Sequence, residues 1–193
     1  MPNVPTDSAA TPADKGSAPW FADPALKFVT PELKRAVDVW HEKRGTRTMP
    51  SRDDMSIRDL AFALPNIGFV DIVKTGGVTR FKVRLMGSVL DEFVAPMTGH
   101  FVDEVVPERF ATKWATHWQP SIDQRAPLRA VARVEFAERR WYVSEALHAP
   151  LATDGETPDV LMVAAYFHST EGFEGRSRDM AERLQQELAQ RTA

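Results

Sequence analysis

Five stretches between Ile67 and His168 have the apolar spacing of β-strands. They cover residues 67–73, 78–86, 128–137, 140–150 and 160–168. In the second stretch, apolar residues from Phe81 to Leu85 alternate with basic residues from Arg80 to Arg84, so that strand has one apolar and one polar face. The last stretch is apolar at both alternating positions, which predicts a central strand covered on both faces.

The segments between these strands predict one tight turn and a helical middle. Residues 74–77 read Lys-Thr-Gly-Gly, which favours a hairpin between the first two strands. A short helical turn is expected to open at Gly87 and Ser88 and to end at Pro96. After Pro107 a longer helix is predicted, because Phe110, Trp114 and Trp118 recur four residues apart and form one large aromatic stripe. That stripe needs a sheet to pack against.

Helices are also predicted on either side of this core. Thr30 and Pro31 are typical of a helix start, and the helix then presents an apolar stripe from Leu33 to Trp40 before it stops at Gly45. A second short helix is expected from Ser56 to the residue before Pro65, and a polar helix closes the chain. We expect the helix after Thr30 to pack on the outer face of the sheet. The alternative is that a partner subunit packs there.

These elements predict one α+β domain with a five-stranded antiparallel sheet. Helices lie on one face, the N-terminal helix lies on the other face, and a C-terminal helix follows. Residues 1–24 are rich in Pro, Ala, Ser and Thr and predict a disordered leader, with Trp20 and Phe21 docking at its end. The domain is expected over residues 25–170 and the C-terminal helical extension over residues 171–193.

Composition narrows the classes of function. A formal charge of −3 over 193 residues gives no broad cationic surface, so we expect no nucleic-acid binding and no membrane insertion. No apolar run is long enough to cross a bilayer, and no secretory signal is present, so a cytoplasmic location is expected. The chain has no cysteine, which excludes disulfides, thiolate metal sites and cysteine nucleophiles.

Several local motifs resemble a bacterial family of small stand-alone PAS-like proteins. They occur at residues 40–45, 49–53, 64–67, 84–88 and 98–100, where the sequence reads WHEKRG, MPSRD, LPNI, RLMGS and TGH. Two strands, short helices, a longer helix and three strands is also the order of elements in the PAS fold. The resemblance covers residues 33–168.

The resemblance implies a sensory or interaction module with a pocket between the sheet and the helices, often working as a homodimer. PAS relatives bind haem, flavin, organic acids or nothing, so the cofactor is unknown. A cysteine-linked flavin adduct is excluded. A haem is not the expected cofactor, and His100 and His117 are the histidines best placed to hold one. No kinase, cyclase or helix-turn-helix output region is fused to the domain, so we expect a small ligand, a separate signalling protein, or both, as partners.

Two sets of residues are candidates for binding. A ligand pocket is predicted around Phe81, Val83, Leu85, Phe93, Phe110, Trp114, Val134 and Phe136. These side chains are equally suited to a plain core. An anion site is possible at Arg44, Arg47, Arg52 and Arg84, whose forked donors suit a carboxylate or phosphate. The alternative is that these arginines pair internally with Asp53, Asp54 or Asp59.

Catalysis has little support from the sequence. Ser144 and His148 share a strand face but lie about 13 Å apart along it, too far for a nucleophile and its base. No histidine pair has the spacing of helical metal ligands, and no catalytic or metal residue is predicted. The leading interpretation is therefore a sensory module and not an enzyme.

Two other functions remain open. A small enzyme of the isomerase or lyase type could use the same cavity, and a buried carboxylate or histidine with a displaced pKa inside it would favour that alternative. A ligand-free dimerisation module is the third hypothesis, and a filled interior would favour it.

Overall fold

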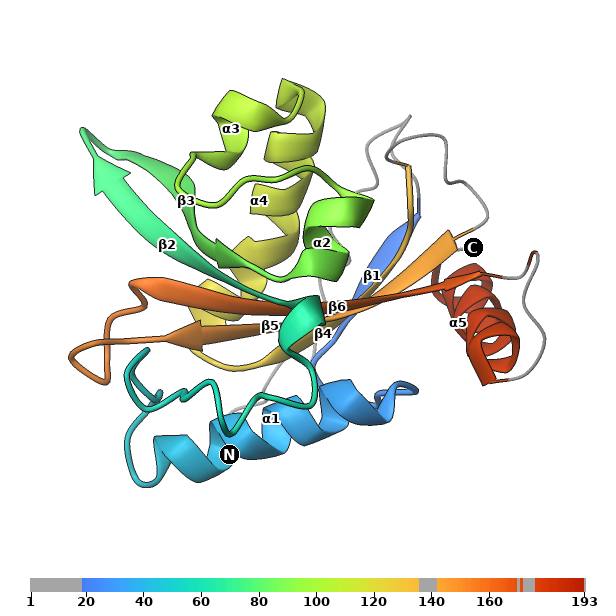
Figure 1. Cartoon of the computed structure of the whole chain (residues 1–193), viewed down its shortest axis with the longest axis horizontal. Helices are drawn as coiled ribbons and strands as arrows, with labels where there is room; N and C mark the ends of the chain where they lie inside the picture. Colours follow the sequence, from blue (N-terminus) through green and yellow to red (C-terminus); the bar gives the residue numbers. More distant parts are fainter. Residues whose placement is uncertain (1–18, 136–141, 170, 172–175, 193) are drawn as a thin grey trace, which may run out of the picture.

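One antiparallel sheet of six strands runs through the described part of the chain, which comprises residues 19–135, 142–169, 171 and 176–192 of this computed structural model (Figure 1). The strands are β1 (Trp20–Asp23), β2 (Ile67–Thr75), β3 (Val78–Met86), β4 (Leu128–Arg133), β5 (Tyr142–Leu151) and β6 (Val160–Ser169), and they lie in the order β1-β4-β5-β6-β2-β3. The predicted α+β class and antiparallel arrangement are confirmed. The strand count is one higher than expected.

The additional strand is β1, which lies within the range predicted as a leader. It pairs with β4 in a register that sets Phe21 opposite Val131. An unpaired strand edge presents free N–H and C=O groups, and β1 satisfies those of β4. The predicted leader boundary at residue 24 is therefore too late, whereas residues 1–18 lie outside the described residues.

Helices cover both faces of the sheet. The helices α2 (Ser88–Phe93), α3 (Val102–Val105) and α4 (Glu108–Gln124) lie over one face (Figure 1). The helix α1 (Pro31–Arg44) lies on the opposite face, and α5 (Arg176–Thr192) packs beside it against β1, β4, β5 and β6. The expected position of the N-terminal helix is confirmed. Among the described residues, no helix is both long enough and apolar enough to span a membrane.

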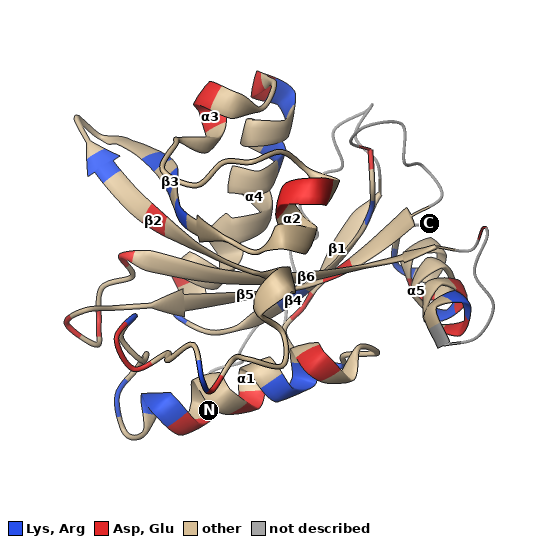
Figure 2. Ribbon diagram, viewed as in Figure 1, with Lys and Arg blue, Asp and Glu red and all other residues tan. Residues whose placement is uncertain are grey.

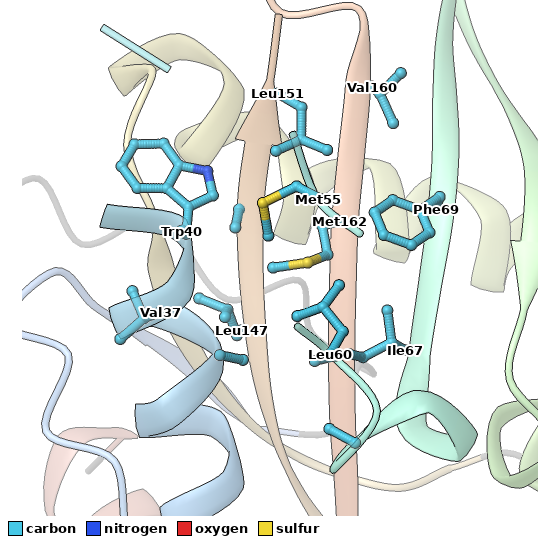
Figure 3. Packing of buried hydrophobic residues seen from close by; sticks show 14 of the residues in the cluster. Val37, Trp40, Met55, Leu60, Ile67, Phe69, Leu147, Leu151, Val160 and Met162 are labelled. Carbon is cyan, nitrogen blue, oxygen red and sulfur yellow. The ribbon is translucent and has the colours of Figure 1, made fainter. Parts of the chain in front are cut away.

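Buried apolar side chains of α1, β2, β5 and β6 gather beneath α1, and Figure 3 shows part of this cluster. Trp40 is buried against β5, and its indole Nε1 donates a 2.8 Å hydrogen bond to the Pro150 carbonyl. Met162 of β6 points into this core, whereas its neighbour Leu161 points into the core under α4. The central strand is therefore covered on both faces, as its uninterrupted apolar run predicts.

The segment expected as a second short helix contains turns and the 3-10 helix η1 (Leu64–Asn66) instead. The Ser56 hydroxyl does accept the Asp59 N–H at 3.2 Å, as a helix cap would. The later bonds join residues three apart, such as Ala63 N–H to the Leu60 carbonyl, because Pro65 has no N–H with which to continue an α-helix.

The remaining strand boundaries agree closely with the sequence pattern. The β2–β3 hairpin turns at Gly76 and Gly77, which have φ of 59° and 80°, a region that glycine enters without steric cost. The third predicted strand ends earlier than expected, at Arg133, and residues 136–141 lie outside the described residues.

Candidate functional site: an apolar cavity with two buried histidines

A cavity of about 170 Å³ lies between the sheet and the helices α2 and α4. Every strand except β1 contributes to its walls. The lining residues are Gly68, Val70, Val83, Met86, Leu90, Phe93, Val94, Met97, Phe110, Lys113, Trp114, His117, Trp118, Ala130, Ala132, Arg133, Val134, Glu135, Ser144, Ala146, His148, Val163, Ala165 and Phe167.

The sheet side of the cavity wall carries six small residues, which leave room for the cavity. These are Gly68, Ala130, Ala132, Ser144, Ala146 and Ala165. The helices supply the large aromatic groups that face them, including Trp114 and Trp118 of α4. Large side chains on one wall therefore do not reach small side chains on the other, which leaves space at the centre.

Five of the eight side chains predicted for a ligand pocket line this cavity: Val83, Phe93, Phe110, Trp114 and Val134. Phe81 is buried but belongs to the packed region beside the cavity, where its ring meets Trp118 edge-on at 5.0 Å between centroids. Phe136 lies outside the described residues. That these groups hold a ligand remains a prediction.

Leu85 is not part of the cavity wall, and its placement there is corrected. It is 40% exposed, whereas Met86 lines the cavity. The cause is a β-bulge: Phe69 pairs with Leu85 and the next residue, Val70, pairs with Val83, so β3 carries one extra residue. The strict alternation seen in the sequence breaks at that point, and the side chains beyond it change faces.

Two buried histidines are the main polar groups of the cavity wall. His117 of α4 is 7% exposed and His148 of β5 is 4% exposed. Neither His117 Nε2 nor His148 Nδ1 has a hydrogen-bond partner among the described residues. The indole of Trp20, from β1, stacks on the His117 ring with 3.8 Å between centroids.

Burial lowers the pKa of both rings. The pKa of His117 falls to about 3, mainly through desolvation, with further contributions from nearby His148 and Lys113. Desolvation lowers the pKa of His148 to about 4, although a hydrogen bond with the backbone of His117 acts in the opposite direction. Both imidazoles are therefore neutral at pH 7.

The other polar groups of the wall are largely paired. Lys113 Nζ lies 2.5 Å from Glu135 Oε2, and the lysine side chain is only 13% exposed. The Ser144 hydroxyl donates to the Ala132 carbonyl at 3.2 Å. Ser144 and His148 both line the cavity, so they share a strand face as their spacing predicts.

The four arginines proposed as an anion site each contact other groups of the chain. Arg47 pairs with Asp54 at 2.8 Å, one of the internal partners expected, and Arg84 pairs with Asp71 at 2.8 Å. The others contact aromatic rings or the backbone: Arg52 lies 4.0 Å from the Phe69 ring centroid and donates to the Met55 carbonyl, and Arg44 lies 5.8 Å from the Trp40 ring centroid. Anion binding at these residues remains a prediction.

A buried ionic cluster on the opposite face of the sheet was not anticipated. Arg129 of β4 contacts three carboxylates: Glu145 at 2.5 Å, Glu187 of α5 at 2.9 Å and Asp23 of β1 at 3.3 Å. We call these four residues the Arg129 cluster. The signal in the sequence was a charged residue inside each of two apolar strand runs, because such residues are rarely buried without a partner.

The Arg129 cluster also holds the start of α1. The Glu145 carboxylate accepts the backbone N–H groups of Val29 at 2.9 Å and Thr30 at 2.8 Å. The Thr30 hydroxyl in turn lies 3.0 Å from His168 Nε2. One glutamate of β5 is therefore bonded both to the residues that precede α1 and to the arginine that contacts α5.

The cavity does not suit a large cofactor. Its volume is below the roughly 300–1,000 Å³ typical of sites for drug-sized ligands, and a haem is larger still. His100, one of the two proposed haem ligands, is exposed on a loop outside the cavity. Within the described part of the chain, no three His, Asp or Glu side chains come together as a metal site.

Comparison with known proteins agrees with this fold. A sequence profile of the PAS domain matches residues 29–164, which is most of the chain. The chain therefore belongs to the PAS domain family, and its class is that of sensory and signalling modules. The resemblance to PAS proteins expected from the sequence is confirmed.

A solved structure described as "Structure of an RNA-binding Light-Oxygen-Voltage Receptor" is similar, with 11% sequence identity and a TM-score of 0.47. The match covers 90% of this chain and 44% of that receptor, so this chain spans less than half of its length. A search of curated proteins finds no match.

Proposed function

We propose that this protein is a cytoplasmic sensory module that binds a small molecule in the cavity and transmits its presence to a partner protein through the face formed by α1 and α5. The observation that carries the proposal is the back-to-back position of the cavity and the Arg129 cluster. Both include residues of the strands β4 and β5.

Neighbouring residues on these strands face the two sites. Ala130 lines the cavity and Arg129, the preceding residue, is in the cluster. Ser144 and Ala146 line the cavity on either side of Glu145. A ligand that shifts β5 by a fraction of an ångström therefore moves Glu145 as well, and packed interiors transmit such strain because they have few voids.

The strand β1 gives a second connection between the faces. Trp20 stacks on the cavity histidine His117, whereas Phe21, the next residue, packs with Leu184 and Leu188 of α5. Phe21 also lies beneath two guanidinium groups, with Arg191 of α5 at 4.6 Å and Arg129 at 5.6 Å from its ring centroid. Two adjacent residues of β1 therefore contact the cavity wall and the C-terminal helix.

The outward surfaces of α1 and α5 suit a protein partner. Figure 2 shows acidic and basic residues interspersed along both helices. Mixed charge of this kind favours a partner with complementary charges over a uniformly anionic surface such as nucleic acid. The partner in this proposal is a separate signalling protein or a second copy of the chain in a homodimer.

The proposal is tested by a substitution that fills the cavity and leaves the surface formed by α1 and α5 unchanged. In the Ala146→Leu variant the added atoms enter the cavity, whereas in the control, Ala61→Leu, they enter solvent because Ala61 is exposed. Two-dimensional amide NMR with a panel of neutral, acidic and basic fragments of benzene size should show binding at cavity residues and shifts in α5. Both responses should be lost in Ala146→Leu and kept in Ala61→Leu.

A second variant and a mass measurement complete the test. Trp114→Ala should also change the response while the fold survives, since Trp114 forms part of the wall. An unchanged response with full stability would count against the cavity as the sensing site. Native mass spectrometry of the purified protein should report any retained small molecule together with the number of subunits.

An enzyme of the isomerase or lyase type is the second candidate, and the two buried histidines with displaced pKa values are the observation that favours it. Rings with pKa values of about 3 and 4 are weak bases, whereas an efficient general base has a pKa near the working pH. The sensory function is therefore preferred. Recovery of a bound compound unchanged after prolonged incubation would support the sensor, and its conversion would support the enzyme.

A further inference from the structure

The size and shape of the cavity restrict its occupant to about one aromatic ring. Its volume of about 170 Å³ is close to that of an apolar cavity of about 150 Å³ that takes up benzene. Phe93 and Phe167 stack in parallel at 4.0 Å between centroids and form one side, and Trp114 and Trp118 contribute another. Flat aromatic walls pack efficiently against a planar ring.

The charges of the wall do not favour an ion. The Lys113 ammonium is paired with Glu135, and both imidazoles are neutral at pH 7. Arg133 is exposed, so solvent screens its charge. A carboxylate that entered the cavity would lose its hydration and meet only the solvent-screened charge of Arg133, which is costly.

The histidines nevertheless provide one specific polar contact. His148 Nδ1 is buried in the cavity wall and has no hydrogen-bond partner among the described residues. A neutral imidazole carries a lone pair on one of its two ring nitrogens, so Nδ1 can act as a buried hydrogen-bond acceptor.

From these observations we propose that the cavity selects small uncharged aromatic molecules that carry an O–H or N–H group, of about the size of phenol, and that His148 Nδ1 accepts the hydrogen bond from that group. This inference rests on the proposed function, since it names the ligand class for the same cavity. His117 Nε2 is a second unpartnered atom of the wall, available to a further polar substituent.

Selectivity between matched compounds tests the proposal. In a purely apolar cavity 4-fluorotoluene outcompetes 4-fluorophenol, because the phenol hydroxyl loses its hydration. An acceptor at Nδ1 reverses this order. At pH 7.5 we expect ¹⁹F NMR titration to give 4-fluorophenol about 10-fold tighter binding than 4-fluorotoluene, and no binding of 4-fluorobenzoate.

Variants assign the preference to one atom. His148→Leu replaces the imidazole with an apolar side chain of similar size that has no hydrogen-bond acceptor. In this variant 4-fluorotoluene should bind at least as well as 4-fluorophenol. His100→Gln, at an exposed position outside the cavity, should keep the wild-type preference. If His148→Leu does not fold, ¹⁵N imidazole spectra of the wild-type protein show whether His148 Nδ1 accepts the hydrogen bond. 4-Fluorophenol should shift the resonance of the unprotonated His148 Nδ1, and 4-fluorotoluene should not.

The outcomes separate this inference from the proposed function. If 4-fluorotoluene binds the wild-type protein as tightly as 4-fluorophenol, or 4-fluorobenzoate binds best, the ligand class is wrong while the cavity remains a binding site. An unchanged His148 resonance in the presence of bound 4-fluorophenol would also overturn the assignment. If none of the three compounds binds, the proposed ligand-binding role of the cavity fails as well.

Discussion

Arg129 and Glu145 form an ion pair in which neither side chain is exposed to solvent, with Nε and Oε1 2.5 Å apart. Charges are expensive to bury, and this pair retains the hydrogen bonds that offset the cost: Glu145 accepts two backbone N–H groups, and Arg129 also contacts Glu187 and Asp23. The pair lies directly behind the cavity, so it connects the candidate binding site with both terminal helices.

Removal of Arg129 should be strongly destabilising. Arg129→Met leaves Glu145 buried without its cation, and we expect the free energy of unfolding to fall by about 3–5 kcal/mol. Urea denaturation followed by circular dichroism measures this change. Arg84→Met is the matched control, because Arg84 forms an exposed pair with Asp71 and should cost only about 0–1 kcal/mol. Equal losses in the two variants would refute the structural role of the buried pair.

Stability should fall as the pH drops below about 6.5, the usual pKa of an unfolded histidine. The folded protein holds His148 and His117 neutral until about pH 4 and pH 3, so below pH 6.5 protons bind preferentially to the unfolded chain. Each histidine then removes up to about 1.4 kcal/mol of stability per pH unit.

Unfolding free energies measured between pH 7 and pH 5 check this prediction. The slope should become shallower in His148→Leu and stay unchanged in His100→Gln. A slope that is the same in all three proteins would show that His148 takes up its proton equally in the folded and unfolded chains, which contradicts the prediction.

Gly87 should tolerate no side chain, even though its φ of −74° is ordinary. A Cβ at this position would lie 2.3 Å from the Leu64 carbonyl oxygen and 2.5 Å from the Pro65 carbonyl oxygen, both of which are backbone atoms. We expect Gly87→Ala to reduce the unfolding free energy by about 3 kcal/mol. Gly68→Ala, whose nearest contacts are 3.4 Å and 3.5 Å, should change it by less than about 1 kcal/mol.

The sequence predicts those parts of the fold that depend on local pattern. The uninterrupted apolar run of β6 indicated a central strand, and the stripe from Leu33 to Trp40 indicated the helix that covers the outer face. Alternation also placed Ser144 and His148 on one face of β5. In each case the spacing of side chains along a single element was sufficient.

Features that depend on pairing between distant residues could not be predicted in this way. The bulge that turns Leu85 outward is a property of the β2–β3 register and leaves no mark in the alternation of β3 itself. The bonds from Glu145 to Val29 and Thr30 join residues more than 100 positions apart. β1 likewise exists because β4 offers it a free edge, which only the folded sheet reveals.

Coupling between the cavity and the outer face is the central claim, and hydrogen exchange with mass spectrometry tests it most directly. The full chain is compared with and without saturating 4-fluorophenol. We predict that the ligand changes amide exchange in α5, around Ala181, Leu184 and Leu188, as well as at the cavity, and that Arg129→Met reduces the change in α5 while the change at the cavity is kept. A change restricted to α2, α4 and the cavity strands in the wild-type protein would contradict the account.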